Sequence, residues 1–195
     1  MKLIMCAGMP RAGSTVQYRI VEQIVHLVEP GAPSREGFRK GGPLLKQERP
    51  GYAVIRLPRF WSKALAFRPK VITSCCDPRH FVAERVAVAK PFEQVLEELA
   101  LYIDAFEQWS AVPGALAMRY EALIRDLTRT VLYIARWLEI PVTKEQAQTI
   151  AVGSGFSNRR KVHAWQEVLS KDQQSTIVGG HKEFMLRAKY LKEGE

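Results

Sequence analysis

The chain has 195 residues, a length typical of one domain, and 47% of its residues are hydrophobic while 25% are charged. That balance is typical of a globular protein and excludes a disordered tail, a collagen-like repeat and a disulfide-stapled miniprotein. Its 29 Lys and Arg against 20 Asp and Glu leave a net charge of +9, which favours an anionic partner.

The positive charge is unevenly distributed along the chain. Residues 1–90 carry a net charge of +10, residues 91–155 one of −4 and residues 156–195 one of +3. We therefore expect the bound anion to contact the first half of the chain and its tail.

The chain opens with a predicted strand, turn and helix. Lys2–Ala7 is a short apolar run that stops at a glycine, which is typical of a buried parallel strand. After the turn Gly8–Gly13, apolar residues recur at helical spacing until Pro30 ends the helix. These residues are Val16, Ile20, Val21, Ile24, Val25 and Val28.

Residues 30–51 form a predicted long basic loop. They contain five glycines, four prolines and five basic residues, and loops of this length are usually functional or disordered. We therefore expect this loop to border a binding site.

Further strands and helices are predicted to alternate along the rest of the chain. Strands are expected at Tyr52–Leu57, at Lys70–Cys76, where Asp77-Pro78 turns the chain, and at Ala115–Met118. A helix with one apolar stripe begins at Pro91, and another covers Thr128–Leu138.

Capping boxes at Thr143 and Ser170 open two more predicted helices. Strands that alternate with helices indicate an α/β fold with three layers, a parallel sheet flanked by helices. We expect one domain that spans residues 1–195.

The three cysteines, Cys6, Cys75 and Cys76, are too few for a disulfide framework and lack metal-site spacing. Buried free thiols in a reducing compartment are the expectation. The N-terminal apolar run is too short for a signal peptide, and no run reaches the 18 residues needed to cross a bilayer. The sequence therefore predicts a cytoplasmic protein without a transmembrane segment.

The turn after the first strand has the composition of a phosphate cradle. Its sequence is GMPRAGST, residues 8–15, and backbone N–H groups in such a turn converge on an anion at the start of a helix. The frame is that of a nucleotide-binding P-loop, but Ser14 stands where that loop has lysine, and Arg11 supplies the cation. P-loops that bind nucleoside triphosphates use this lysine and Mg²⁺ to offset the charge of the γ-phosphoryl group. A sulfuryl group carries less charge and needs no Mg²⁺. If the turn binds a sulfuryl donor, we expect no metal.

The pattern G-x-P-[KR]-[SA]-G-[ST]-[ST] resembles the 5′-phosphosulfate loop of sulfotransferases that use 3′-phosphoadenosine 5′-phosphosulfate (PAPS). Two further stretches are similar to that family, one from Met118 to Leu138 and one from Lys161 to Ser170. The resemblance implies the P-loop NTPase-like sulfotransferase fold and PAPS as the donor substrate. The implied donor contacts are Pro10, Arg11, Ala12, Gly13, Ser14 and Thr15.

A second family signature, R-D-P-R-D-x-x-x-S, holds the 3′-phosphate through its first arginine and its serine. Here Cys76 and Glu84 occupy those two positions, and a carboxylate facing a phosphate is repulsive. The remaining candidates for the 3′-phosphate cation are Arg79, Arg85, Arg159 and Arg160.

The resemblance also suggests catalytic groups. Many family members carry Lys-Thr-His at the end of the second strand, where this chain has Arg56. Others use a glutamate after the first helix, which makes Glu36 the first candidate for the base that takes the acceptor's proton; His80 and His163 are alternatives. Arg11 and Arg56 are expected to stabilise negative charge during transfer.

The resemblance implies sulfuryl transfer from PAPS to a hydroxyl or amine of a small molecule or glycan. We expect the acceptor to contact the loop 30–51, on the acceptor side of the site, and its charge favours an acidic acceptor. One alternative is a P-loop kinase of a small molecule, in which Asp77 holds Mg²⁺. Another is a catalytically degenerate nucleotide-binding or regulatory protein of the same fold, suggested by Cys76 and Glu84. Specific nucleic-acid binding is not expected, because the sequence lacks a zinc pattern and an aromatic ribonucleoprotein motif.

Overall fold

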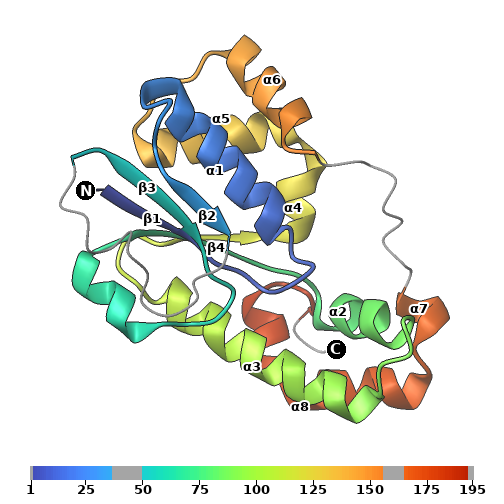
Figure 1. Ribbon diagram of the computed structural model, residues 1–195. Helices are drawn as coiled ribbons and strands as arrows, with labels where there is room; N and C mark the ends of the chain where they lie inside the picture. Colours follow the sequence, from blue (N-terminus) through green and yellow to red (C-terminus); the bar gives the residue numbers. More distant parts are fainter. Residues whose placement is uncertain (1, 37–49, 156–164, 193–195) are drawn as a thin grey trace.

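A five-stranded parallel sheet forms the centre of the computed structural model, which describes residues 2–36, 50–155 and 165–192. The strand order is β2-β3-β1-β4-β5, so the first strand lies in the middle (Figure 1). Because all strands are parallel, the turns that follow them gather at one edge of the sheet. The strands are β1 (Lys2–Cys6), β2 (Ser34–Glu36), β3 (Tyr52–Arg56), β4 (Lys70–Cys75) and β5 (Leu116–Arg119).

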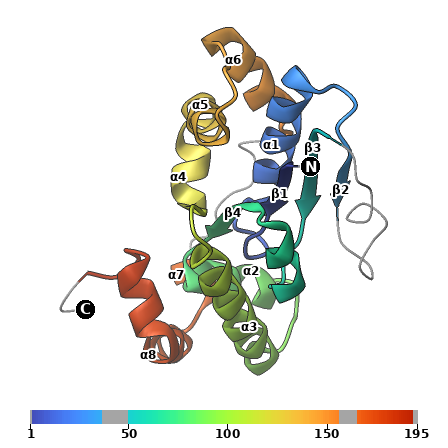
Figure 2. The ribbon, with the colours of Figure 1, turned by 90° about the vertical axis from the view of Figure 1, so that its left-hand side faces the viewer.

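Helices cover both faces of the sheet, as Figures 1 and 2 show. One layer holds α1 (Ser14–Val28), α4 (Tyr120–Arg125), α5 (Leu127–Leu138) and α6 (Lys144–Gly153). The opposite side holds the 3-10 helix η2 (Ser62–Phe67), α2 (Pro78–Val86), α3 (Phe92–Ser110), α7 (Trp165–Val168) and α8 (Lys171–Arg187). This arrangement confirms the predicted α/β fold with three layers.

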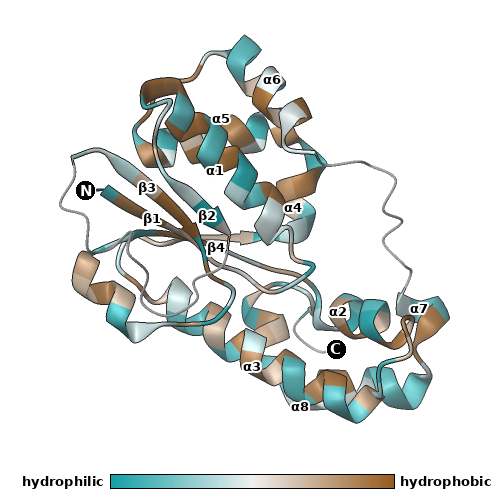
Figure 3. Ribbon diagram, in the orientation of Figure 1, coloured by the Kyte–Doolittle hydropathy of each residue, from teal (hydrophilic) through white to brown (hydrophobic). Residues whose placement is uncertain are grey.

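The two faces of β1 are buried against different helices. Ile4 and Cys6 belong to the apolar cluster of α1, α5 and α6, whereas Leu3 and Met5 pack in the cluster that contains Trp109 of α3. A strand buried on both faces needs a continuous apolar run rather than an alternating one. In Figure 3, β1 and β3 are accordingly coloured as hydrophobic and the edge strand β2 as hydrophilic.

Most predicted elements are confirmed, including the strands at residues 52, 70 and 115 and both capping boxes, at Thr143 and Ser170. One difference is β2, which forms inside the expected loop 30–51 by pairing with β3 at the sheet edge. Residues 37–49 of that loop lie outside the described residues. No helix in the described ranges is long and apolar enough to span a bilayer.

A second difference is α2, a helix where only a turn was expected. Asp77 caps it, since its Oδ1 accepts a hydrogen bond from the Arg79 backbone N–H at 2.9 Å, and Pro78 occupies the first turn. An Asp N-cap before a Pro is a strong start signal. The signal was missed because α2 has no apolar stripe at helical spacing.

Candidate active site

The turn between β1 and α1 contains three residues with positive φ: Gly8, Arg11 and Gly13. Gly8 has φ +135°, and a Cβ there would lie 2.5 Å from Ser74 Oγ and 2.9 Å from the Ser74 backbone. Gly13, the N-cap of α1, has φ +76°, and Arg11 has φ +70°. Positive φ at a residue other than glycine costs free energy, so the fold holds Arg11 in this conformation.

The turn places the N-terminus of α1 at the edge of the sheet where the turns that follow the strands gather. The first N–H groups of a helix lack intrahelical acceptors, and the Gly13 cap has no side chain that could accept them. Ser14 and Thr15 therefore bring N–H groups, hydroxyl groups and the positive end of the helix dipole to one place.

A cavity of about 450 Å³ opens over this helix end. Three arginines line it, Arg11, Arg19 and Arg56, and none of the described residues that line it is acidic. Arg56 Nη2 donates to Ser14 Oγ at 3.2 Å, and Arg19 Nη1 donates to the Ser154 carbonyl at 3.4 Å. The geometry and the charge both favour an anion in this cavity.

Arg11 is held by a carboxylate from α2. Its Nε lies 3.1 Å from Glu84 Oε2, and the other oxygen of Glu84 lies 3.6 Å from His80 Nε2. His80 is buried and stacks on Tyr120, with ring centroids 6.2 Å apart. Glu84 thus contacts the cation of the loop, and neither Glu84 nor His80 lines the cavity.

Cys76 and Arg79 lie at the start of α2. The Cys76 side chain is fully buried, and burial, with Glu121 nearby, holds the pKa of its thiol well above the usual value, so it stays uncharged. The Arg79 guanidinium makes a forked ion pair with Asp77, with an Nη2–Oδ2 distance of 2.7 Å. It also donates to the Tyr190 carbonyl at 3.1 Å and lies 4.2 Å from the centre of the Trp165 ring.

The structure therefore brings together only some of the predicted site residues. Pro10, Arg11, Gly13, Ser14, Thr15 and Arg56 line one cavity, whereas Ala12 is buried beneath the turn. Arg85 lies elsewhere, paired with Glu98 of α3 at 3.5 Å. Glu36 ends β2 and pairs in register with Arg56, the last residue of β3. Arg159, Arg160 and His163 lie outside the described residues.

Five lining residues were not predicted as site residues from the sequence: Val16, Arg19, Tyr120, Ser154 and Gly155. The signal for Arg19 was available, because it follows Thr15 by four residues and so lies on the same face of α1. The position of Tyr120 depends on contacts between residues far apart in the sequence. Tyr120 directly follows β5, and no local pattern could place it near Gly13.

Comparison with known families decides the identity. The family model described as "Sulfotransferase domain" matches residues 81–189, more than half of the chain. The chain belongs to the sulfotransferase family. The matched segment begins within α2 of this sulfotransferase, so the turn at residues 8–15 lies outside it.

Solved structures extend the likeness of this sulfotransferase to nearly its whole length. A mouse sulfotransferase, SULT7A1, complexed with PAP has a TM-score of 0.71 at 15% identity and covers 97% of this chain and 85% of its own. Retinol dehydratase in complex with androsterone and the inactive cofactor PAP has a TM-score of 0.69 at 15% identity, over 95% and 82%.

Sulfotransferase STF9 from Mycobacterium avium has a TM-score of 0.58 at 13% identity, over 94% of this chain and 76% of its own. At these identities the likeness shows the fold, and the fold agrees with the family. A search of curated protein sequences gave no match.

Proposed function

We propose that this sulfotransferase transfers a sulfuryl group from PAPS to a hydroxyl or amine of an acceptor. The observation that carries the proposal is the cavity over the N-terminus of α1, lined by three arginines and by no acidic residue of the described chain. The solved relatives that were crystallised with PAP support the choice of nucleotide.

The donor contacts we propose are those of the turn and of the helix that follows it. Arg11, the N–H groups at the start of α1 and the hydroxyls of Ser14 and Thr15 would bind the 5′-phosphosulfate. Pro10, Ala12 and Gly13 shape the turn around it. Gly13 also lets Tyr120 approach closely, because a Cβ there would lie 3.1 Å from the Tyr120 ring.

Transfer needs one bond to form and one to break. The acceptor oxygen or nitrogen attacks sulfur, and the bond from sulfur to the bridging oxygen of the donor breaks. Adenosine 3′,5′-bisphosphate (PAP) then leaves with the negative charge of that oxygen. Arg11 and Arg56 line the cavity, where their guanidinium groups would stabilise the charge that develops.

The acceptor's proton goes to a base, for which we propose Glu36. Its support is the backbone register, which sets Glu36 opposite Arg56 at the edge of the sheet where β2 and β3 end. A base must lie within hydrogen-bond reach of the proton that it removes. The buried His80, held beside Glu84, is the alternative within the described chain.

For the 3′-phosphate we propose cations of the C-terminal half, Arg159 and Arg160, with Arg79 as a further contact. Arg79 already has Asp77, Tyr190 and Trp165 as partners, so a phosphate would have to share it. Arg85, which was predicted with them, is turned toward Glu98 of α3.

The proposal extends to the chain as a whole. We propose one sulfotransferase-like domain over residues 1–195, with the segment 30–51 on the acceptor side and a small molecule or glycan, acidic in character, as acceptor. Cys6, Cys75 and Cys76 are free thiols, which supports a reducing, cytoplasmic compartment.

The test is release of PAP from PAPS in the presence of an acceptor panel that contains a phenol, a sterol and an amino sugar. We expect acceptor-dependent release without added Mg²⁺ and its loss in Arg11→Ala. Turnover of ATP that depends on Mg²⁺ would favour the kinase alternative. Tight PAP binding without turnover on any acceptor would favour the regulatory alternative, which Cys76 and the Glu84–Arg11 ion pair suggest.

A further inference from the structure

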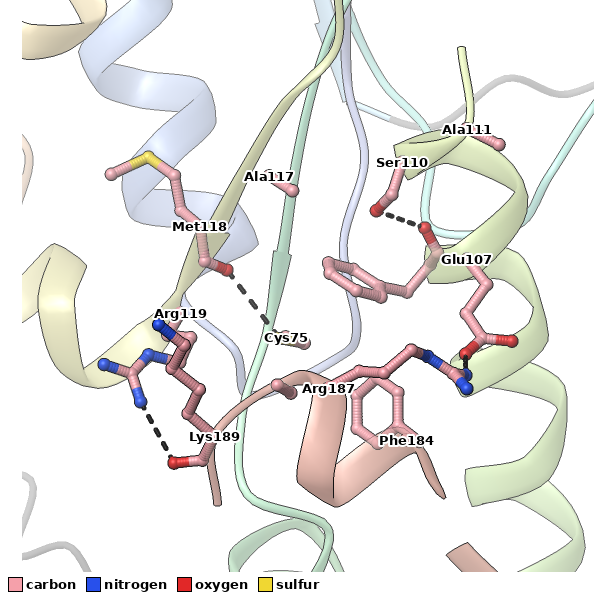
Figure 4. Close-up of a pocket in the computed structure, with 12 residues that line it drawn as sticks. Cys75, Glu107, Ser110, Ala111, Ala117, Met118, Arg119, Phe184, Arg187 and Lys189 are labelled. Atoms are coloured by element: carbon pink, nitrogen blue, oxygen red, sulfur yellow. Dashed lines mark hydrogen bonds and ion pairs between the residues drawn. The ribbon is translucent and has the colours of Figure 1, made fainter. Parts of the chain in front are cut away.

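A second, larger cavity lies on the face of the sheet that α3 and α8 cover. Its volume is about 690 Å³, and it is enclosed by β5, the C-terminal end of α3 and the C-terminal end of α8 (Figure 4). It shares no lining residue with the cavity over α1. Its chemistry can therefore be considered apart from the proposed transfer site.

The walls of this cavity are largely apolar. Phe106 of α3 and Phe184 of α8 meet edge to face, with ring centroids 5.9 Å apart. Both line the cavity, as does Ala117 of β5. The Met118 side chain points away from the cavity and packs in the cluster of α1, α5 and α6 (Figure 4). Cys75 adds a thiol whose pKa burial raises to about 12, so it brings no charge. A wall of this kind suits a hydrocarbon chain or ring.

One side of the cavity carries an excess of positive charge. Arg187 forms an ion pair with Glu107 and lies 3.7 Å from Glu183, so its charge is compensated. Arg119 donates to the Lys189 carbonyl at 3.2 Å. Neither Arg119 nor Lys189 has a carboxylate partner within residues 2–36, 50–155 and 165–192.

The Arg119 side chain lies against the backbone of Lys189 and the ring of Tyr190. The Arg119 guanidinium lies 5.9 Å from the centre of the Tyr190 ring, and Lys189 has φ +58°. Figure 4 shows Arg119 and Lys189 on one side of the cavity and Phe184 on the other. A single ligand could place an anionic group beside the two cations and an apolar part against Phe106 and Phe184.

We propose that this cavity binds an amphipathic monoanion, with an apolar chain or ring system and one carboxylate or sulfate head group. The head group pairs with Arg119 and Lys189, while the apolar part contacts Phe106, Phe184 and Ala117. A neutral molecule of the same shape leaves the two cations without a partner, so the site selects for the anion.

Calorimetric titration of the full chain with decanoate, decyl sulfate and the neutral decanamide tests this site. We expect both anions to bind at one site and decanamide to bind at least about tenfold more weakly, since a charge-assisted contact is lost. The ratio of the decanoate and decyl sulfate affinities tells which head group the site prefers.

Two variants locate the binding. The double variant Arg119→Met, Lys189→Met removes the cations and should weaken decanoate binding about tenfold or more. Ala117→Phe fills the cavity from an exposed position on the edge strand, where an aromatic residue suits a strand, and should abolish binding while the circular dichroism spectrum stays unchanged.

Two matched controls complete the test. Arg125→Met, an exposed change on α4, and Arg11→Ala should leave decanoate affinity unchanged. Equal affinity for decanamide and decanoate would overturn the proposal. A loss in Arg11→Ala as large as in the double variant would also overturn it, because the anion would then occupy the cavity over α1.

Discussion

Arg11 Nε lies 3.1 Å from Glu84 Oε2, so the cation of the turn between β1 and α1 is paired with a carboxylate from α2. The Glu84 side chain is 14% exposed and the Arg11 side chain 39%. The carboxylate fixes the direction of Arg11 and also lowers the positive potential that an incoming anion meets. Glu84 therefore repels a ligand with several negative charges, while Arg11 attracts it.

Glu84→Gln separates these two effects, because it keeps a hydrogen-bonding oxygen near Arg11 and removes the charge. We expect PAP to bind roughly threefold to tenfold more tightly to this variant, as repulsion by a partly screened charge is lost. Calorimetry at constant salt measures the change. Glu183→Gln makes the same change of charge on an exposed residue of α8 and should leave the affinity unaltered; weaker binding to Glu84→Gln would show that positioning dominates.

Gly8→Ala should destabilise the folded chain by about 1–3 kcal/mol, because the position combines a φ of +135° with a close approach to Ser74. Gly179→Ala is the matched change in α8, where a Cβ meets nothing within 4 Å, and it should stabilise by up to about 1 kcal/mol. Urea unfolding of both variants gives the two free energies. Equal effects of the two substitutions would contradict the close packing of the turn on β4.

Arg56→Lys should lower kcat about a hundredfold while KM for PAPS changes little. Lysine keeps the positive charge but cannot reproduce the forked guanidinium that reaches Ser14 Oγ, and lost stabilisation of developing charge appears in kcat. Steady-state kinetics with an acceptor from the panel measures both constants. Arg59→Lys, three residues later and exposed, is the control; a rise in KM alone would assign Arg56 to binding.

Cys6, Cys75 and Cys76 should not react with Ellman's reagent in the folded chain at pH 8, since all three are buried and burial raises each thiol's pKa. All three should react after unfolding in guanidinium chloride. Rapid reaction of any thiol under native conditions would show that the structure opens at β1 or β4.

Because the Cys75 thiol is buried, the free energy of unfolding should depend on pH in the alkaline range. The Cys75 pKa rises from 9.0 to about 12 on folding, so above pH 9 the unfolded chain binds fewer protons than the folded one. Its contribution to the free energy of unfolding is present below pH 9 and is lost progressively as the pH rises toward 12. Cys75→Ala should show a shallower decline over that range than the unsubstituted chain.

The sequence was enough to predict the parts of the fold that are local. The apolar run at Lys2–Ala7, the glycine turn and the capping boxes at Thr143 and Ser170 each signal their element through neighbouring residues. The order of the strands was not predictable, because pairing of β1 between β3 and β4 depends on contacts between residues far apart in the sequence.

In the candidate site, too, the sequence predicts the local features but not the contacts between distant residues. Arg11, Ser14 and Thr15 lie within one turn, so their proximity follows from the motif. The pairing of Arg11 with Glu84 joins residues more than seventy positions apart, and Glu84 was predicted only to repel a phosphate. Arg79 and Arg85 lie on the same short helix, yet Asp77 and Glu98 decide where each guanidinium points.

Titration of the chain with PAP in a calorimeter, for the unsubstituted protein, Arg11→Ala and Arg125→Ala, tests the proposed donor site most directly. We expect one binding site in the unsubstituted protein, an affinity at least about tenfold lower in Arg11→Ala and an unchanged affinity in Arg125→Ala. No measurable binding to the unsubstituted protein, or equal binding to all three, would contradict a phosphosulfate site at the N-terminus of α1.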